Sequence, residues 1–159
     1  MAKSGIWMLA GFIVLSLLAG AIGSFFTFQS IPGWYASLQK PWFTPPSWVF
    51  GPVWTLLYVL MGSAAYLIYE KGLKKPEVRS ALEVFGIQLA LNAAWSVAFF
   101  GLRSIPGGLA IIVLLWLSII WATALFWKLS RNAALMMLPY ILWTCLAALL
   151  NYSLFFLNP

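Results

Sequence analysis

Few side chains in this sequence are suited to covalent or metal chemistry. Its 159 residues include no histidine, one cysteine, Cys145, and three acidic residues, Glu70, Glu77 and Glu83. A metal site needs several histidine, thiolate or carboxylate ligands, and a nucleophile needs a base beside it. Because the glutamates lie near the ends of apolar runs, we predict no metal site and no catalytic residues.

Two amide side chains are more informative, because they interrupt an otherwise apolar run. Gln88 and Asn92 lie one helical turn apart, and Trp95, Ser96 and Phe99 continue the same stripe. An amide that faced lipid would lose its hydrogen bonds to water without replacement, so the stripe is expected to face other helices. A ligand contact and a simple bond between helices are both compatible with this spacing.

Aromatic residues recur at helical spacing in three further segments. The stripes are Trp54, Tyr58, Gly62 and Tyr66; Tyr140, Trp143, Ala147 and Asn151; and Trp116, Ile120, Thr123 and Trp127. A single tryptophan or tyrosine near the end of a span is usually an anchor at the membrane interface. Converging rings with a few amides are suited to a flat apolar ligand that has polar edges.

These residues must be positioned by helices that cross a membrane. The chain is 64% hydrophobic and 8% charged, which is too apolar for a soluble domain of this length. We predict an all-α membrane protein, one domain over residues 1–159, with spans at 6–28, 47–69, 80–102, 108–127 and 133–157. A secretory signal is the alternative for the first run, but that run exceeds the roughly 7–15 residues of a signal core.

A stretch rich in proline and tryptophan separates the first two spans. Pro41, Pro45 and Pro46 remove backbone donors and disfavour helical geometry in the residues before them. Ser47 is a plausible N-cap for the following helix, near whose start Pro52 is tolerated. The sequence therefore predicts a long, stiff loop that leads directly into a helix.

The distribution of positive charge predicts the orientation in the membrane. Lys3, Lys128, Arg131 and the four basic residues at 71–79 fall on one side, against Lys40 and Arg103 on the other. In a bacterial or archaeal plasma membrane the N-terminus is then cytoplasmic and the C-terminus lies outside. Topology also accounts for the net charge of +6, and no basic aromatic patch predicts a nucleic-acid partner.

Three segments of the sequence resemble the TspO/translocator protein family, the tryptophan-rich sensory proteins related to the peripheral benzodiazepine receptor. They are GWYASLQKPWFTPPSWVFGPVW (33–54), QLALNAAWSVAFFG (88–101) and PYILWTCLAALLNY (139–152). The resemblance extends over essentially the whole chain. It implies a five-helix bundle in the lipid bilayer, commonly a homodimer, with a pocket closed by the first long loop.

The resemblance also implies a ligand and the residues that hold it. Family members bind porphyrins such as protoporphyrin IX or haem, and some bind sterols or drug-like molecules, without an obligatory cofactor. Matching pocket positions are Trp34, Tyr35, Trp54, Asn92, Trp95, Trp143, Ala147 and Leu150, to which the helical stripes add Tyr58, Gln88, Phe99 and Tyr140. The lid motif corresponds to Trp42, Phe43, Pro45 and Pro46, preceded by Lys40 and Pro41.

Two departures from the family pattern limit what is carried over. The usual tryptophan of the W-x-P-P motif is Phe43 here, and the indole stands at Trp42 instead. The cholesterol consensus begins at Leu150 and Tyr152 but has no basic residue after it, so sterol binding is not expected.

Three functions are compatible with this sequence. The first is a membrane receptor, sensor or carrier for tetrapyrroles. The second is a light-dependent enzyme that degrades bound porphyrin through the photochemistry of the ligand and nearby indoles. The third is a non-catalytic scaffold, in which the tryptophans only anchor and pack the helices.

Overall fold

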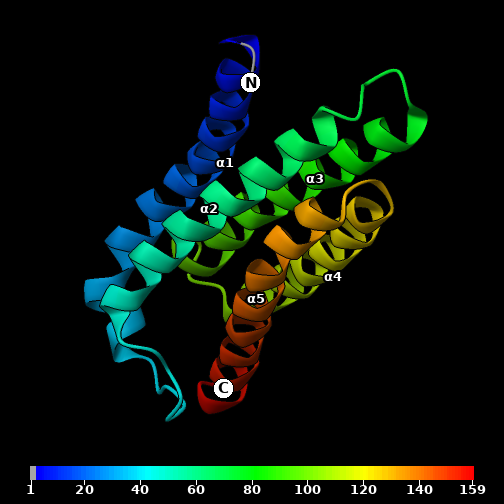
Figure 1. Ribbon diagram of the computed structural model, residues 1–159. Helices are drawn as coiled ribbons and strands as arrows, with labels where there is room; N and C mark the ends of the chain where they lie inside the picture. The colour runs from blue at the N-terminus through cyan, green and yellow to red at the C-terminus, as the bar shows by residue number, and fades with distance from the viewer. Residues whose placement is uncertain (1–2) are drawn as a thin grey trace.

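The computed structural model describes residues 3–159, and within this range the protein consists of helices without any strand. The long helices are α1 (Lys3–Ser30), α2 (Ser47–Tyr69), α3 (Pro76–Ser96), α4 (Ile105–Leu129) and α5 (Arg131–Leu157) (Figure 1). Each is long and apolar enough to cross a membrane. The prediction of an all-α protein with five membrane spans is confirmed. Residues 1–2 of the predicted domain lie outside the described range.

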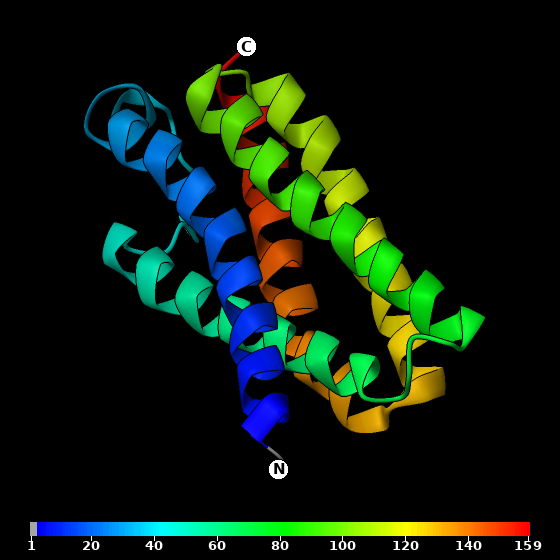
Figure 2. The same cartoon turned by 90° about the horizontal axis from the view of Figure 1, so that it is seen from above.

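The helices are arranged so that the loops alternate between two ends of the bundle. The N-terminus, the α2–α3 turn and the α4–α5 turn share one end, and the α1–α2 loop, the α3–α4 turn and the C-terminus share the other (Figures 1 and 2). In sequence order α1 contacts α2, α3 contacts α4, and α4 contacts α5, while α2 also packs on α5 and α1 on α3.

Two short π-helical segments extend α1 and α3. They are η1 (Ile31–Tyr35) and η2 (Val97–Gly101). After η1 the helical path continues to Ser37, so the predicted end of the first helix at residue 28 is wrong. Pro32 lacks an N–H group, and in a regular helix its ring would clash with the carbonyl group four residues earlier. The wider π turn accommodates the proline without ending the helix.

The other predicted boundaries differ by a few residues, for reasons of capping. Helix α2 has its predicted bounds, but Pro46 occupies the N-cap position and Ser47 is the first helical residue. Helix α3 begins at Pro76, because proline is well tolerated at the first position of a helix. Helices α4 and α5 begin after Ser104 and Ser130, whose hydroxyl groups accept the capping hydrogen bonds. The fourth span therefore begins at Ile105 and not at residue 108, and residues 106–108 belong to the first turn of α4.

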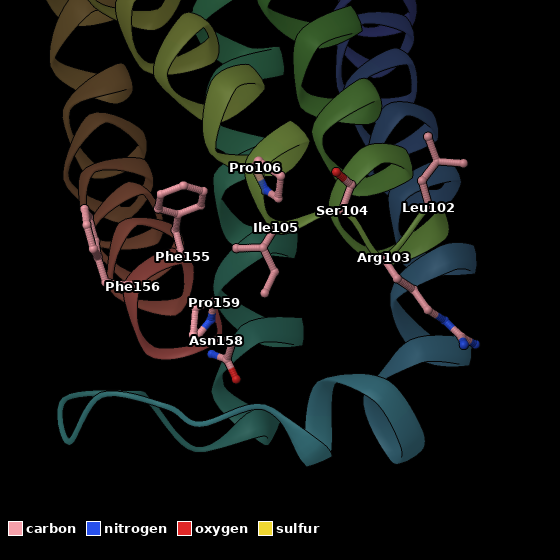
Figure 3. Close-up of a pocket in the computed structure, with 9 residues that line it drawn as sticks. All are labelled: Leu102, Arg103, Ser104, Ile105, Pro106, Phe155, Phe156, Asn158 and Pro159. Carbon is pink, nitrogen blue, oxygen red and sulfur yellow. The ribbon is translucent and has the colours of Figure 1, made fainter.

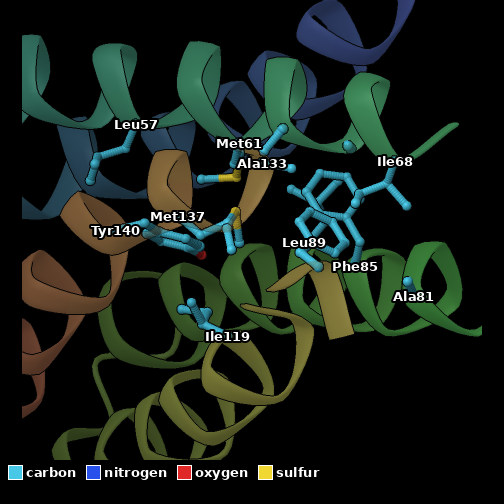
Figure 4. Packing of buried hydrophobic residues seen from close by; sticks show 14 of the residues in the cluster. Leu57, Met61, Ile68, Ala81, Phe85, Leu89, Ile119, Ala133, Met137 and Tyr140 are labelled. Atoms are coloured by element: carbon cyan, nitrogen blue, oxygen red, sulfur yellow. The ribbon is translucent and has the colours of Figure 1, made fainter. Parts of the chain in front are cut away.

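The main hydrophobic core lies between α2, α3, α4 and α5. Leu57, Met61, Phe85, Ile119 and Met137 are among its fully or almost fully buried members (Figure 4). Helix α1 packs against the outside of this core and buries mostly small residues. The exposed faces of the long helices carry large apolar side chains, as expected for surfaces in contact with lipid.

Helix α1 approaches its neighbours closely at glycines. A Cβ atom on Gly62 would lie 2.7 Å from the Cα atom of Ile13, and a Cβ atom on Gly20 would overlap the ring of Tyr58. On Gly23 a Cβ atom would lie 2.7 Å from the hydroxyl oxygen of Ser96. Small residues at these positions allow the helix backbones to come together.

Candidate functional site

A cavity of about 440 Å³ lies between α1, α2 and the C-terminal part of α3. Its walls are formed by Leu17, Gly20, Ala21, Gly23, Ser24, Thr27, Phe28, Ile31, Tyr35, Ser47, Phe50, Gly51, Trp54, Thr55, Tyr58, Trp95, Ser96 and Phe100. Helices α4 and α5 contribute no residue to this lining. The volume falls within the roughly 300–1,000 Å³ that is typical of small-molecule sites.

Aromatic rings form the deep wall of the cavity. The ring of Trp54 stacks on Tyr58, with the ring centres 5.7 Å apart and the planes at 27°. Trp54 also lies 6.1 Å from Trp95, with the planes at 31°. Trp95 in turn stacks on Phe99 at 6.0 Å and 15°. Neighbouring rings from α2, α3 and η2 are therefore inclined to one another by 31° or less.

The two π-helical segments meet at the outer end of the cavity. The Ser30 hydroxyl group donates a buried hydrogen bond of 2.6 Å to the backbone oxygen of Phe100. The ring of Tyr35 packs on Phe100 at 5.7 Å and on Phe99 at 6.3 Å, and Trp34 packs on Phe99 at 5.3 Å. These contacts fix Tyr35 against η2, where it lines the cavity.

The predicted polar residues form a hydrogen-bonded chain behind the wall. Tyr58 donates to the Oδ1 atom of Asn92 at 2.6 Å, and the Nδ2 atom of Asn92 donates to the Tyr140 oxygen at 2.9 Å. Tyr140 then donates to the Oε1 atom of Gln88 at 3.0 Å. The prediction that Gln88 and Asn92 face the bundle interior is confirmed, because both are almost fully buried. Their polar atoms bind other helices, and neither residue lines the cavity.

The predicted residues on α5 also lie behind the lining. Trp143 packs edge-on against Phe50 at 5.6 Å, and its buried Nε1 atom has no hydrogen-bond partner in the part of the chain that the structure describes. Ala147 is buried in the cluster that contains Trp95 and Phe99. Leu150 is buried as well. Of the twelve candidates, Tyr35, Trp54, Tyr58 and Trp95 line the cavity, and the others support these four or lie deeper in the bundle.

The stripe predicted on α4 does not converge on the interior. Ile120 is 37% exposed and Trp127 is 49% exposed, so this prediction is wrong for both residues. The buried face of α4 is displaced by about one position and carries Ile119 and Phe126, which pack into the core. Only Trp116 reaches a neighbouring helix with its polar atom, by donating to the backbone oxygen of Ile141 at 3.2 Å.

The predicted lid, residues 40–46, crosses the end of the bundle beside the cavity and contributes no residue to its lining. Trp42 is 94% exposed and contacts Phe43 edge-on. Thr44 donates two hydrogen bonds to the backbone oxygen of Pro41, from its backbone N–H at 3.1 Å and from its hydroxyl group at 2.7 Å. These bonds form a tight turn. Pro45 and Pro46 then lead into α2.

Sequence reasoning missed the contribution of α1 to the cavity. Ser24, Thr27 and Phe28 line it from α1, and Phe50 and Gly51 line it from the first turns of α2. The available signal was the repetition of small residues on α1. The same pattern is produced by ordinary close packing between helices, so by itself it does not indicate a cavity.

A second, shallower depression lies at the same end of the bundle, between the α3–α4 turn and the end of α5. Its volume is about 670 Å³, and its lining comprises Leu102, Arg103, Ser104, Ile105, Pro106, Phe155, Phe156, Asn158 and Pro159 (Figure 3). Arg103 extends away from Phe155 and Phe156, so the polar and apolar groups do not converge. The aromatic cavity is therefore the better candidate site.

The lining of the aromatic cavity is suited to binding and offers no catalytic pair. Its polar side-chain groups are the hydroxyl groups of serine, threonine and tyrosine and the indole N–H groups of two tryptophans, without an imidazole, thiol or carboxylate group. Among the described residues, no group of three histidine, cysteine or acidic side chains is placed to hold a metal ion. Rings of this kind can bind a flat apolar molecule, and the hydroxyl groups can bind its polar edge.

Comparison with known proteins agrees with the motifs noted in the sequence. The model of the TspO/MBR family matches residues 12–157. The chain is 42% identical over 147 residues to the "Tryptophan-rich protein TspO" of Chlorobaculum tepidum, covering 92% of this chain and 93% of that protein. It is 40% identical over 146 residues to the "Translocator protein" of Bos taurus, covering 91% and 86%. The protein described here belongs to the TspO/MBR family.

Proposed function

We propose that this protein is a membrane receptor or carrier that binds a tetrapyrrole, such as protoporphyrin IX or haem, in the aromatic cavity. The observation that carries the proposal is the wall formed by Trp54, Tyr58 and Trp95, whose planes differ by about 30° or less between neighbours. A flat macrocycle can pack against the parts of these rings that line the cavity. Each aromatic pair contributes roughly 0.5–1.5 kcal/mol beyond the burial of its area.

The polar groups of the cavity support the same class of ligand. The hydroxyl group of Tyr58 is already used, because it donates to Asn92. Tyr35, Ser24 and Ser47 line the outer part of the cavity and offer hydroxyl groups to a polar edge. A porphyrin combines a broad apolar face with polar substituents on one side, which matches this division. The name of the bovine relative, "Translocator protein", is compatible with a carrier.

The charge distribution supports an orientation for this activity. The basic residues at 71–79, Lys128 and Arg131 lie at the end of the bundle that also holds the N-terminus. The positive-inside rule then directs this end to the cytoplasm and the loop 38–46 to the outside. Reporter fusions at residue 73 and at residue 42 test the orientation, and an external signal at residue 73 contradicts it.

Filling the cavity provides a direct test of the proposed function. A Cβ atom added at Gly51 meets no other atom within 4 Å, so Gly51→Leu adds a side chain to the cavity lining without an immediate clash. Protoporphyrin IX is titrated into the protein in lipid nanodiscs, and quenching of tryptophan fluorescence is measured. We expect Gly51→Leu to weaken binding about tenfold or more.

The matched control is Gly86→Leu, on α3. A Cβ atom at Gly86 also meets nothing within 4 Å, and this residue is exposed and lies outside the cavity lining. The control should bind the porphyrin like the parent protein. Equal affinity of Gly51→Leu and the parent would show that the ligand occupies another place.

A further inference from the structure

The aromatic cavity contains no charged residue, but one lysine lies beside its outer end. That end is formed by Ile31 and Tyr35 of η1 and by Ser47 and Phe50 of α2. Lys40 belongs to the loop that joins these two segments. Its Nζ atom lies 4.9 Å from the centre of the Tyr35 ring, in a cation–π contact with a residue of the lining.

The ammonium group of Lys40 is held in one place by the backbone. It donates to the carbonyl oxygens of Ala36 and Leu38, both at 3.1 Å. These carbonyls lie where the helical path of α1 ends, and the carbonyl groups at a helix end lack partners within the helix. An ammonium group has three N–H bonds. Two are used by the backbone, and the third has no hydrogen-bond acceptor among the described residues.

No acidic side chain is near enough to neutralise Lys40. The sequence has only three acidic residues, Glu70, Glu77 and Glu83. They lie at the end of α2 and in the first turns of α3, at the opposite end of the bundle from the loop 38–46. The half-buried ammonium therefore has no acidic side chain as a partner, and it lies beside an apolar cavity, where an anion is attracted more strongly than in water.

We propose that Lys40 makes the site selective for ligands that carry a carboxylate group on the edge facing the loop. This inference rests on the proposed porphyrin binding and adds the chemical feature by which Lys40 selects among flat ligands. The macrocycle packs on Trp54 and Trp95, and a carboxylate on its outer edge accepts hydrogen bonds from Lys40 and from the Tyr35 hydroxyl. The alternative is that Lys40 only caps the helix end, in which case the ligand's charge has no influence.

A pair of ligands that differ only in charge separates these two roles. Protoporphyrin IX has two carboxylates, and its dimethyl ester has none. Both are titrated into the protein in nanodiscs of phosphatidylcholine, and the ratio of the two dissociation constants is compared between variants. Because all variants share one lipid composition, the different partition of the two ligands into the bilayer cancels in this comparison.

We expect the preference for the diacid over the ester to be about three- to tenfold stronger in the parent protein than in Lys40→Gln, as a charge-assisted hydrogen bond provides. Lys40→Gln should remove this part of the preference by weakening the binding of the diacid, because the glutamine amide can still donate to the backbone carbonyls but carries no charge. Lys40→Arg should keep the preference. Arg103→Gln removes the other basic residue at this end of the bundle and should have no effect on the ratio.

The possible failures are distinguishable. If Lys40→Gln weakens the binding of both ligands equally, Lys40 acts only on the fold of the loop, and the proposed selectivity for a carboxylate is refuted. Unchanged ratios in both Lys40 variants refute it too, while the proposed porphyrin binding stands. If the parent protein binds neither ligand, the proposed function itself fails.

Discussion

The side-chain amide of Asn158 holds the backbone of Gln39 from both sides. Its Oδ1 atom accepts the Gln39 N–H at 2.9 Å, and its Nδ2 atom donates to the Gln39 carbonyl oxygen at 3.0 Å. Nδ2 also lies 3.0 Å from the carbonyl oxygen of Leu154, so the amide is oriented by its own helix. This residue ties the loop 38–46 to the end of α5, although the two partners are 119 positions apart.

Asn158→Ala is expected to release the loop without unfolding the bundle. Each of the two exposed hydrogen bonds to Gln39 contributes about 0.5–1.5 kcal/mol. Hydrogen–deuterium exchange at the amide of Gln39 should accelerate about tenfold, whereas exchange in the middle of α5 should not change. Asn132→Ala is the control, since Asn132 is an exposed residue at the other end of α5. Equal protection of Gln39 in both variants contradicts the proposed anchor.

Tyr58→Phe is expected to destabilise the bundle by about 0.5–2 kcal/mol. The substitution removes the 2.6 Å hydrogen bond to Asn92 and leaves a buried amide oxygen without its donor. Unfolding in mixed micelles, followed by circular dichroism, measures this cost. Tyr152→Phe serves as the control, because Tyr152 is 55% exposed. A Tyr58→Phe variant as stable as the control would show that the hydrogen-bonded chain contributes nothing.

Gly62→Ala is expected to disturb the contact between α1 and α2. The added methyl group would lie 2.7 Å from the Cα atom of Ile13 and 2.8 Å from the backbone oxygen of Phe12. Backbone atoms cannot rotate away as side chains do, so α1 must shift, at a cost of about 1–3 kcal/mol. Gly11→Ala on α1 adds the same group where nothing lies within 4 Å. The difference in unfolding free energy between the two variants measures the packing effect, and its absence would argue against the close approach.

Haem and metal-free protoporphyrin IX are expected to bind with affinities within about threefold of each other. The cavity lining has no histidine, cysteine or methionine to ligate the iron, and the chain contains no histidine at all. The two tyrosines of the lining, Tyr35 and Tyr58, ligate iron only as phenolates, and a phenol with a pKa of about 10 is protonated at neutral pH. Affinity should therefore come from contacts with the macrocycle and its edge. Titrations of both ligands, with absorption spectra of the haem complex, check this expectation. A haem affinity more than tenfold higher, together with the spectrum of a strongly ligated iron, contradicts it.

The helices could be predicted from the sequence because their signals are local. A run of apolar residues sets each span, and the prolines at 45 and 46 determine where α2 begins. The inward orientation of Gln88 and Asn92 was also predictable, because lipid cannot satisfy an amide group. The continuation of α1 through Pro32 was not. The π turn that accommodates this proline is stabilised by packing on η2 and by the hydrogen bond from Ser30, neither of which is visible locally.

The site was only partly predictable for a related reason. Helical spacing identifies the face of a helix, but it does not identify the neighbour that this face meets. Trp54 and Trp143 both belong to stripes predicted to face the interior, yet Trp54 lines the cavity and Trp143 packs against Phe50. Only the crossing of α1 over α2 and α3 separates these outcomes. That crossing depends on glycines whose sequence pattern has several interpretations.

Several residues of the cavity lining are also exposed at the surface, namely Ala21, Ser24 and Phe28 on α1 and Gly51 and Thr55 on α2. The cavity is thus open sideways between two spans, where the surrounding medium is hydrocarbon. A ligand that enters from the bilayer is transferred from acyl chains and not from water, and lipid tails are about as apolar as leucine. The hydrophobic effect therefore contributes little to the affinity for the ligand. Selectivity among ligands must come from the shape of the rings and from a few polar atoms. Swapping the bilayer's fatty acids should alter occupancy even where the protein stays the same.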